Sequence, residues 1–113
     1  MTTGLAVLED HRCLEVRVLT DVTVRNAAAI RNGILSAWEE RGRPGPLILD
    51  LAGVHHIDSS GVGALVAVSH HAEDAGVPIF IRGIHKSPRR MLERTALSGL
   101  FQPASRGASA GSA

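Results

Sequence analysis

The chain has 113 residues and a mass of 11.9 kDa, which is the size of one ordinary globular domain. Hydrophobic residues make up 44% of it and charged residues 20%, proportions that exclude a wholly disordered or fibrous chain. Its three aromatic residues are Trp38, Phe80 and Phe101, so the core should be aliphatic, and base stacking on single-stranded RNA is disfavoured. The net charge of +1 also argues against direct binding to nucleic acid.

Cys13 is the single cysteine, which excludes an intramolecular disulfide. No apolar run approaches the roughly 20 residues that cross a bilayer, so membrane insertion is not expected. The N-terminus also lacks the charged and then apolar pattern of a secretory leader. These features favour a cytoplasmic protein.

The N-terminal third of the chain predicts a β-hairpin followed by a helix. Residues 5–9 and 13–19 are β-prone, and a polar break separates them. From Val24 onward, apolar residues recur at spacings of three and four, which predicts an amphipathic helix. Thr23 or Asp21 is the expected N-cap, because short polar side chains favour that position.

The middle of the chain predicts a buried strand and a second helix. Glycine and proline residues within 41–46 end the first helix, and the almost continuously apolar residues 47–51 are typical of a strand covered by helices. We expect residues 53–57 to be extended. Residues 58–61 then offer helix-starting side chains, after which apolar residues resume helical spacing.

The C-terminal part predicts one more strand and one more helix. Gly76 ends the second helix, and residues 77–81 form a strand with its proline near the beginning. Ser87 is the expected N-cap of a third helix, with Pro88 at its first position. The apolar side of this helix should comprise Met91, Leu92 and Leu97.

A single domain is expected to end near residue 102. Residues 100–101 should pack on it or begin a very short strand. Residues 103–113 are almost entirely small, a composition typical of a disordered tail. Together with the alternation of strands and helices, this predicts one α/β domain over residues 1–102.

Asp58, Ser59 and Ser60 lie at the carboxyl end of the buried strand, just before the second helix. This is the usual functional location in open α/β sheets. Two interpretations are open at this point. Asp58 and Ser59 could simply cap the helix, or a serine hydroxyl held there could be reached by another protein, with the free amides of the first turn favouring an anion.

Other chemistries find no support in the sequence. The order SSGVG at 59–63 does not place a serine between the two glycines of a nucleophile elbow, and no dinucleotide fingerprint or phosphate loop is present. The histidine pairs at 55–56 and 70–71 lack the further ligands of a metal site. We therefore expect neither a cofactor nor a metal. The basic stretch 82–94 is interpreted as a solvated helix face, with contact to an acidic partner as the alternative.

Several motifs together resemble the STAS domain, which is named for sulfate transporters and anti-sigma factor antagonists. They are LILDL at 47–51, IDSSGVGAL at 57–65, AGVPI at 75–79 and LERTALSGLF at 92–101. The resemblance covers roughly residues 5–102 and is to a stand-alone domain of the antagonist type. It implies a mixed four- to five-stranded sheet with an N-terminal β-hairpin and about three helices packed mainly on one face.

The resemblance also implies a switch in bacterial transcription control. In this family the unphosphorylated antagonist binds an anti-sigma factor that is also a serine kinase, and a sigma factor is thereby released. Phosphorylation ends the binding, and a serine phosphatase restores it. The acceptor serine of the family corresponds to Ser59, and the chain would be a substrate and ligand, not an enzyme. The implied partner-binding residues are Asp21, Thr23, Asp58, Ser59, Ser60, Gly61 and Val62.

The chain departs from the family pattern in two places. Thr23 stands where the family commonly has an aspartate before the first helix, and a small-residue tail replaces the usual last strand and helix. The missing helix would expose apolar surface, which a homodimer could cover. The alternative function is a scaffold or adaptor subunit of a lipid transport or stress-signalling complex, in which Ser59 only caps a helix.

Overall fold

A computed structural model of the protein describes residues 4–9 and 13–101. The expected tail at 103–113 and the polar break at 10–12 lie outside the described residues. The elements in chain order are β1 (Leu5–Glu9), β2 (Leu14–Val18), α1 (Ala27–Glu40), β3 (Leu47–Asp50), α2 (Ser59–Asp74), β4 (Ile79–Arg82), α3 (Lys86–Leu92) and the 3-10 helix η1 (Ala96–Leu100).

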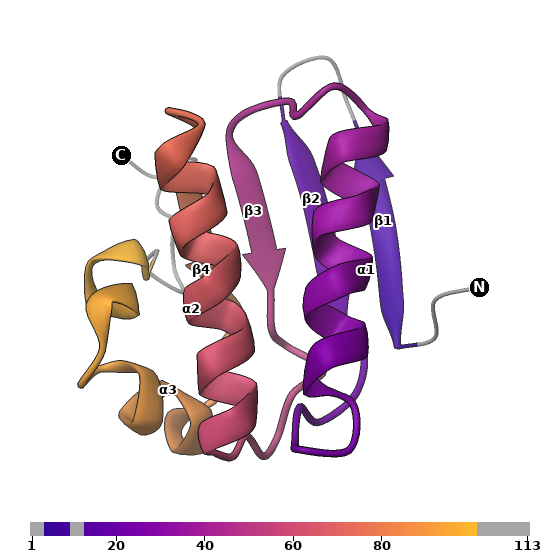
Figure 1. Cartoon of the computed structure of the whole chain (residues 1–113). Coiled ribbons are helices and arrows are strands. Elements are labelled where there is room, and N and C mark those ends of the chain that lie inside the picture. Colours follow the sequence, from indigo (N-terminus) through magenta and orange to yellow (C-terminus); the bar gives the residue numbers. More distant parts are fainter. Residues whose placement is uncertain (1–3, 10–12, 102–113) are drawn as a thin grey trace, which may run out of the picture.

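The four strands form one mixed sheet in the order β1-β2-β3-β4 (Figure 1). β1 and β2 are antiparallel, with Val7 opposite Val16, and form the predicted hairpin. β3 runs parallel to both β2 and β4, with Leu49 between Val16 and Ile81. The fold class expected from the sequence is confirmed, with four strands in the sheet.

Helices α1 and α2 cover the same face of the sheet, and α3 lies beyond the β4 side (Figure 1). Alternation along the strands directs one set of aliphatic side chains toward the helices, where they are almost fully buried. This core is aliphatic apart from Trp38, which is 1% exposed. The helices and strands contribute Leu14, Val16, Val18, Ile30, Ile34, Trp38, Leu47, Leu49, Leu65, Val68 and Ile81 to it.

The opposite face of the sheet carries a network of charged side chains. Arg17 Nε lies 3.0 Å from Glu15 Oε2 and 3.8 Å from Asp50 Oδ2, and Arg82 also pairs with Glu15. Burial raises the pKa of Glu15, but hydrogen bonds and charge from the two arginines outweigh this, and the pKa lies below its ordinary value. These ion pairs keep the middle of this sheet face polar.

The first helix begins later than the sequence predicts. α1 starts at Ala27 with Asn26 as its N-cap, so the prediction of Thr23 or Asp21 as N-cap and of a start near Val24 was wrong. The reason is a local turn: the Thr23 carbonyl accepts hydrogen bonds from the amides of Asn26 and Ala27, and the Asn26 side chain accepts from the Thr23 N–H at 2.9 Å.

Two other expectations need correction. Residues 53–57 are not a strand, because a turn follows β3 and only Ile57 forms an isolated bridge, with Val22. The third helix begins at Lys86 with His85 as its N-cap, not Ser87, and it ends at Leu92.

The apolar side predicted for the third helix is also divided between two elements. Met91 is 40% exposed, whereas Leu97 is buried in the separate helix η1, which Thr95 caps. Phe101 forms an isolated bridge with Ile81.

Candidate functional site

Three loops meet at the carboxyl ends of the parallel strands, at the end of the molecule where α1 and α2 begin (Figure 1). They are residues 19–26, 51–58 and 83–85. Val22 and Ile57 form a parallel bridge between the first two loops, supported by a bond of 3.2 Å from the Val22 N–H to the His56 carbonyl. This end of the sheet holds the residues that the sequence singles out.

Asp58 caps α2 and also ties it to the loop before α1. Its Oδ1 accepts the Gly61 N–H at 2.9 Å, and its Oδ2 accepts the Val24 N–H at the same distance. The hydrogen bond from Gly61, followed by that from Val24, holds the pKa of Asp58 below its ordinary value. The N-cap expected at this position is confirmed, and the carboxylate also joins two loops.

Asp21 likewise joins two loops, because it lies in the 19–26 loop and binds the 51–58 loop. Its Oδ1 accepts the backbone N–H groups of His55 at 2.8 Å and His56 at 3.0 Å. These hydrogen bonds, that from His55 first, lower the pKa of Asp21. Thr23 acts within its own loop, where its hydroxyl accepts the Arg25 N–H at 3.3 Å.

Gly61, which the family resemblance implies is a partner-binding residue, is buried against the neighbouring loop. A Cβ at this position would overlap the Val22 carbonyl oxygen and lie 2.6 Å from Ile57 Cγ1. The residue therefore lets α2 approach the bridge between Val22 and Ile57. Its contribution to the site is to allow this close packing.

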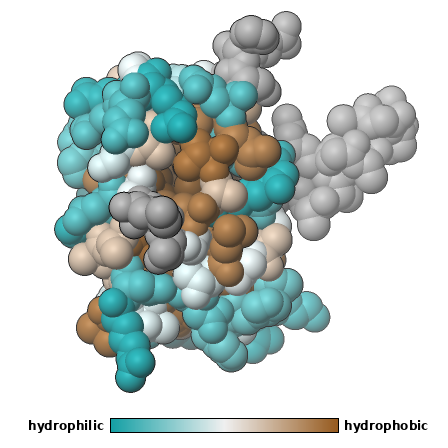
Figure 2. Space-filling model, turned by 90° about the vertical axis from the view of Figure 1, so that its right-hand side faces the viewer, coloured by the Kyte–Doolittle hydropathy of each residue, from teal (hydrophilic) through white to brown (hydrophobic). Residues whose placement is uncertain are grey.

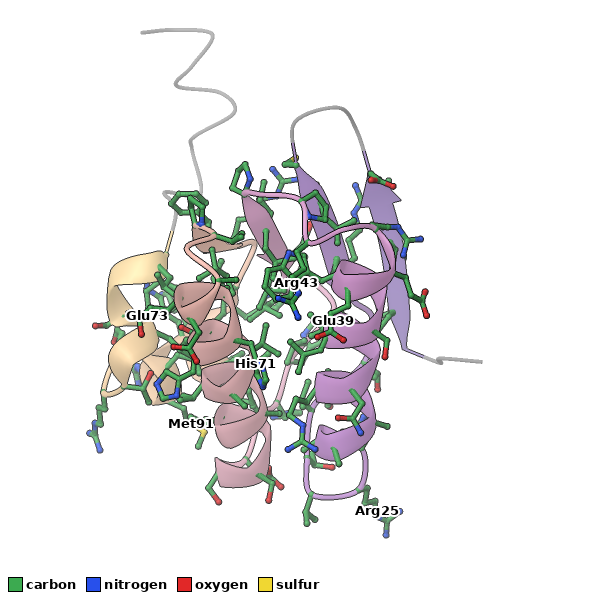
Figure 3. The ribbon with its side chains drawn as sticks, turned by 45° about the horizontal axis from the view of Figure 1, so that its top comes forward. Arg25, Glu39, Arg43, His71, Glu73 and Met91 are labelled. Atoms are coloured by element: carbon green, nitrogen blue, oxygen red, sulfur yellow. The ribbon has the colours of Figure 1, made fainter. Side chains whose placement is uncertain are left out.

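The side chains of Ser59 and Ser60 differ in their surroundings. Ser59 is exposed in the first turn of α2, and its hydroxyl makes no hydrogen bond to the described residues. Ser60 is half-buried and lines a groove of about 340 Å³ between α2 and α1, opposite Arg31. Val62 is half-buried and packs against the core. Arg25 projects outward at this same end of the molecule (Figure 3).

The structure adds contacts that sequence reasoning missed. The rings of His55 and His85 stack with centroids 4.5 Å apart, and His85 Nε2 lies 2.8 Å from the Ala52 carbonyl oxygen. No local pattern could have revealed this pair, because its members lie 30 positions apart in the chain. Within residues 4–9 and 13–101, no group of three or more His, Cys, Asp or Glu side chains could hold a metal ion.

The STAS domain family model matches residues 5–110. Among solved structures, a putative anti-sigma factor antagonist from Thermotoga maritima is similar, with a TM-score of 0.79 and 15% identity over 96% of this chain and 94% of that one. The anti-sigma factor antagonist SpoIIAA in its unphosphorylated form has a TM-score of 0.68 and 16% identity over 96% of each chain. The phosphorylated form of SpoIIAA from Bacillus has a TM-score of 0.70 and 16% identity, over 96% of this chain and 97% of that one.

The anion transporter Slc26a9 from mouse also contains this fold. The match has a TM-score of 0.73 and 23% identity, and it covers 91% of this chain but spans only 18% of the transporter. Among the described residues, no helix has the length and apolarity needed to span a membrane. The chain belongs to the STAS domain family, and its fold is that of the anti-sigma factor antagonists.

Proposed function

We propose that this protein is an anti-sigma factor antagonist controlled by phosphorylation of Ser59. In the unphosphorylated state it binds an anti-sigma factor that is also a serine kinase, and a sigma factor is released. A serine phosphatase restores binding after phosphorylation. The observation that carries this proposal is the exposed Ser59 hydroxyl, which is free of hydrogen bonds to the described residues because Asp58 caps α2.

The surroundings of the two serines favour Ser59 over Ser60 as the acceptor. A kinase must bring its phosphoryl donor in line with the hydroxyl, which requires an accessible side chain. Ser59 is exposed, whereas Ser60 is half-buried in the groove between α1 and α2. We assign Ser60 to the partner-binding surface, together with Thr23, Asp58 and Val62. Asp21 and Gly61 support this surface by fixing its loops.

Charge explains how one phosphate could act as a switch. A phosphate adds about −1.5 to −2 charges, and at Ser59 it would lie beside the Asp58 carboxylate. Within the fold, the free amides and the dipole of the 16-residue helix α2 offset this charge. In a closely fitted interface, the same group would bring repulsion and unpaired polar burial, and each ~1.4 kcal/mol weakens binding tenfold.

The experiment is phosphorylation and binding with candidate anti-sigma factor kinases, using wild type, Ser59→Ala, Ser59→Asp and Ser60→Ala. We expect phosphate on wild type and on Ser60→Ala but none on Ser59→Ala. Ser59→Ala should stay bound in the presence of ATP, and Ser59→Asp should bind at least about tenfold more weakly. Phosphorylation that persists in Ser59→Ala would overturn the assignment of the acceptor.

A complementary experiment separates this function from that of a constitutive adaptor. A gene that carries Ser59→Ala replaces the wild-type gene in the native host, and release of the sigma factor is measured under stress. The switch predicts a sigma factor that stays released. Two results together would contradict the proposal: normal regulation of the sigma factor in the Ser59→Ala strain, and no phosphate on the wild-type protein under any condition.

A further inference from the structure

β1 is an edge strand whose outer side is unpaired within the described part of the chain. The sheet order places β1 at one end, with β2 as its only neighbour. At the other end of the sheet, β4 has a bridge from Phe101 along its edge. An open edge presents a row of free N–H and C=O groups that can pair with another strand.

The hydrogen bonds of the hairpin identify the residues that face this open edge. The Leu19 N–H donates to the Gly4 carbonyl at 2.7 Å, and these two residues are opposite one another in the register. In an antiparallel pair, hydrogen-bonded and non-hydrogen-bonded positions alternate along each strand. Leu5, Val7 and Glu9 therefore direct their backbone N–H and C=O groups outward.

Four of the five side chains along this edge are apolar, and the fifth is the exposed Glu9. β1 reads LAVLE, none of its residues is buried, and Leu8 is 43% exposed. Figure 2 views the molecule from the β1 side and shows a hydrophobic patch in the upper and central part of this face. The strand lacks the lysine or proline with which soluble proteins commonly protect an edge.

Two β1 strands can pair antiparallel about a two-fold axis at Val7, which sets Ala6 opposite Leu8 and Leu5 opposite Glu9. In a pairing centred on Val7, this residue faces its own copy as a hydrogen-bonded pair. Small Ala6 then lies opposite large Leu8 twice, on the uncovered face of the sheet. A two-fold interface requires this reciprocity, in which each residue meets the residue that meets it.

The charges at the edge also allow this pairing. Glu9 is the one charged residue of β1, and its Oε1 lies 3.4 Å from Arg41 Nε of the same chain.

On the helix side, Leu5 and Val7 form one wall of a groove of about 230 Å³ whose other wall includes Gly33 and Ala37 of α1. A second copy would place its own Val7 beside this groove.

We propose that this protein forms a homodimer in which the β1 strands of two copies pair antiparallel about Val7, joining the two sheets into one continuous eight-stranded sheet. The surface at the start of α2 stays open in both copies, because it lies at the end of the sheet and β1 lies at its side (Figure 1). The dimer would therefore display two copies of the Ser59 site.

The test measures molar mass by light scattering and sedimentation equilibrium for the full chain up to millimolar concentration. We expect wild type to approach twice 11.9 kDa. Leu8→Lys should raise the dimer dissociation constant about tenfold or more, because it places two charges in the paired edge. Leu19→Lys is the matched control. Leu19 is 55% exposed but belongs to the segment after β2, so this variant should dimerise like wild type.

Amide hydrogen exchange tests the register without a substitution. The Val7 amide should become slower to exchange as concentration rises, whereas the Ala6 amide, which already faces β2, should change little. A wild-type chain that stays monomeric at millimolar concentration would overturn the proposal. So would a dimer in which Leu8→Lys has no effect and the Val7 amide gains no protection, because the interface would then lie elsewhere.

Discussion

Asp58 and Ser59 are neighbours in the chain, but their side chains have different tasks. Both carboxylate oxygens of Asp58 accept backbone N–H groups from two different segments. Ser59 directs its hydroxyl to the surface and takes no part in this network. The sequence left open whether these residues only cap a helix. In the structure Asp58 is the cap, so Ser59 is available for another role.

This division predicts unequal effects on stability. Ser59→Ala should change the free energy of unfolding by no more than about 0.5 kcal/mol, as is usual for exposed positions without partners. Asp58→Ala should lower the urea midpoint clearly, because the Gly61 and Val24 amides lose their acceptor. Asp58→Asn keeps one acceptor oxygen, so its urea midpoint should lie between those of Ser59→Ala and Asp58→Ala. Equal midpoints for the two alanine variants would contradict the assigned roles.

Stability should also depend on the ionisation of Asp21 and Asp58. Hydrogen bonds to backbone amides lower both pKa values in the folded state, whereas the unfolded value is about 3.9. The stabilisation is therefore complete above the unfolded pKa and is lost as pH falls through the folded pKa, below about pH 4.

Urea unfolding between pH 7 and pH 3 tests this dependence. The wild-type midpoint should fall steeply below about pH 4. Asp21→Asn and Asp58→Asn should be less stable than wild type at pH 7, and the difference should shrink on acidification. A constant difference across the whole range would show that ionisation of these two carboxyls does not stabilise the fold.

At the scale of the elements, the start of α2 is fixed by close packing against the loop before α1. Gly61 lies where any side chain would meet the Val22 carbonyl and the Ile57 side chain. Gly63, two residues further along the same helix, has open space around the position of a Cβ. The two glycines therefore provide a matched pair for testing this contact.

Gly61→Ala should cost at least about 1–3 kcal/mol of unfolding free energy, because the backbone of α2 must move away from Val22. Gly63→Ala should instead leave stability unchanged or raise it by up to about 1 kcal/mol, since alanine is the better helix former. Chemical denaturation of both variants measures the difference. Similar stability of both variants would argue against the tight contact at Gly61.

The elements that the sequence predicts best are those whose periodicity is strong. Apolar spacing identified α1 and α2, and the hairpin followed from two β-prone segments. One error lies at a boundary set by local hydrogen bonds. The turn held by Thr23 and Asn26 delays α1, and helical spacing alone does not encode such a turn.

At the scale of the whole molecule, the site is only partly visible in the sequence. The adjacent residues Asp58 and Ser59 stand out because they directly precede the apolar spacing of α2. The contact from Asp21 to the His55 amide joins residues 34 positions apart, and the stack of His55 on His85 joins two separate loops. Such contacts depend on how the parallel strands bring their loops together.

The hydrogen bonds of Asp58 have a consequence for the chemistry of its neighbour. A hydroxyl that attacks a phosphoryl group must lose its proton, and a nearby carboxylate can accept it as a general base. Asp58 is unsuited to this task, because each of its oxygens accepts a backbone N–H and its pKa is lowered. On the proposed function, the residue that removes the Ser59 proton must therefore come from the docked kinase. The timing of the modification is then decided by the enzyme that binds here, and ATP without that enzyme leaves the serine unchanged.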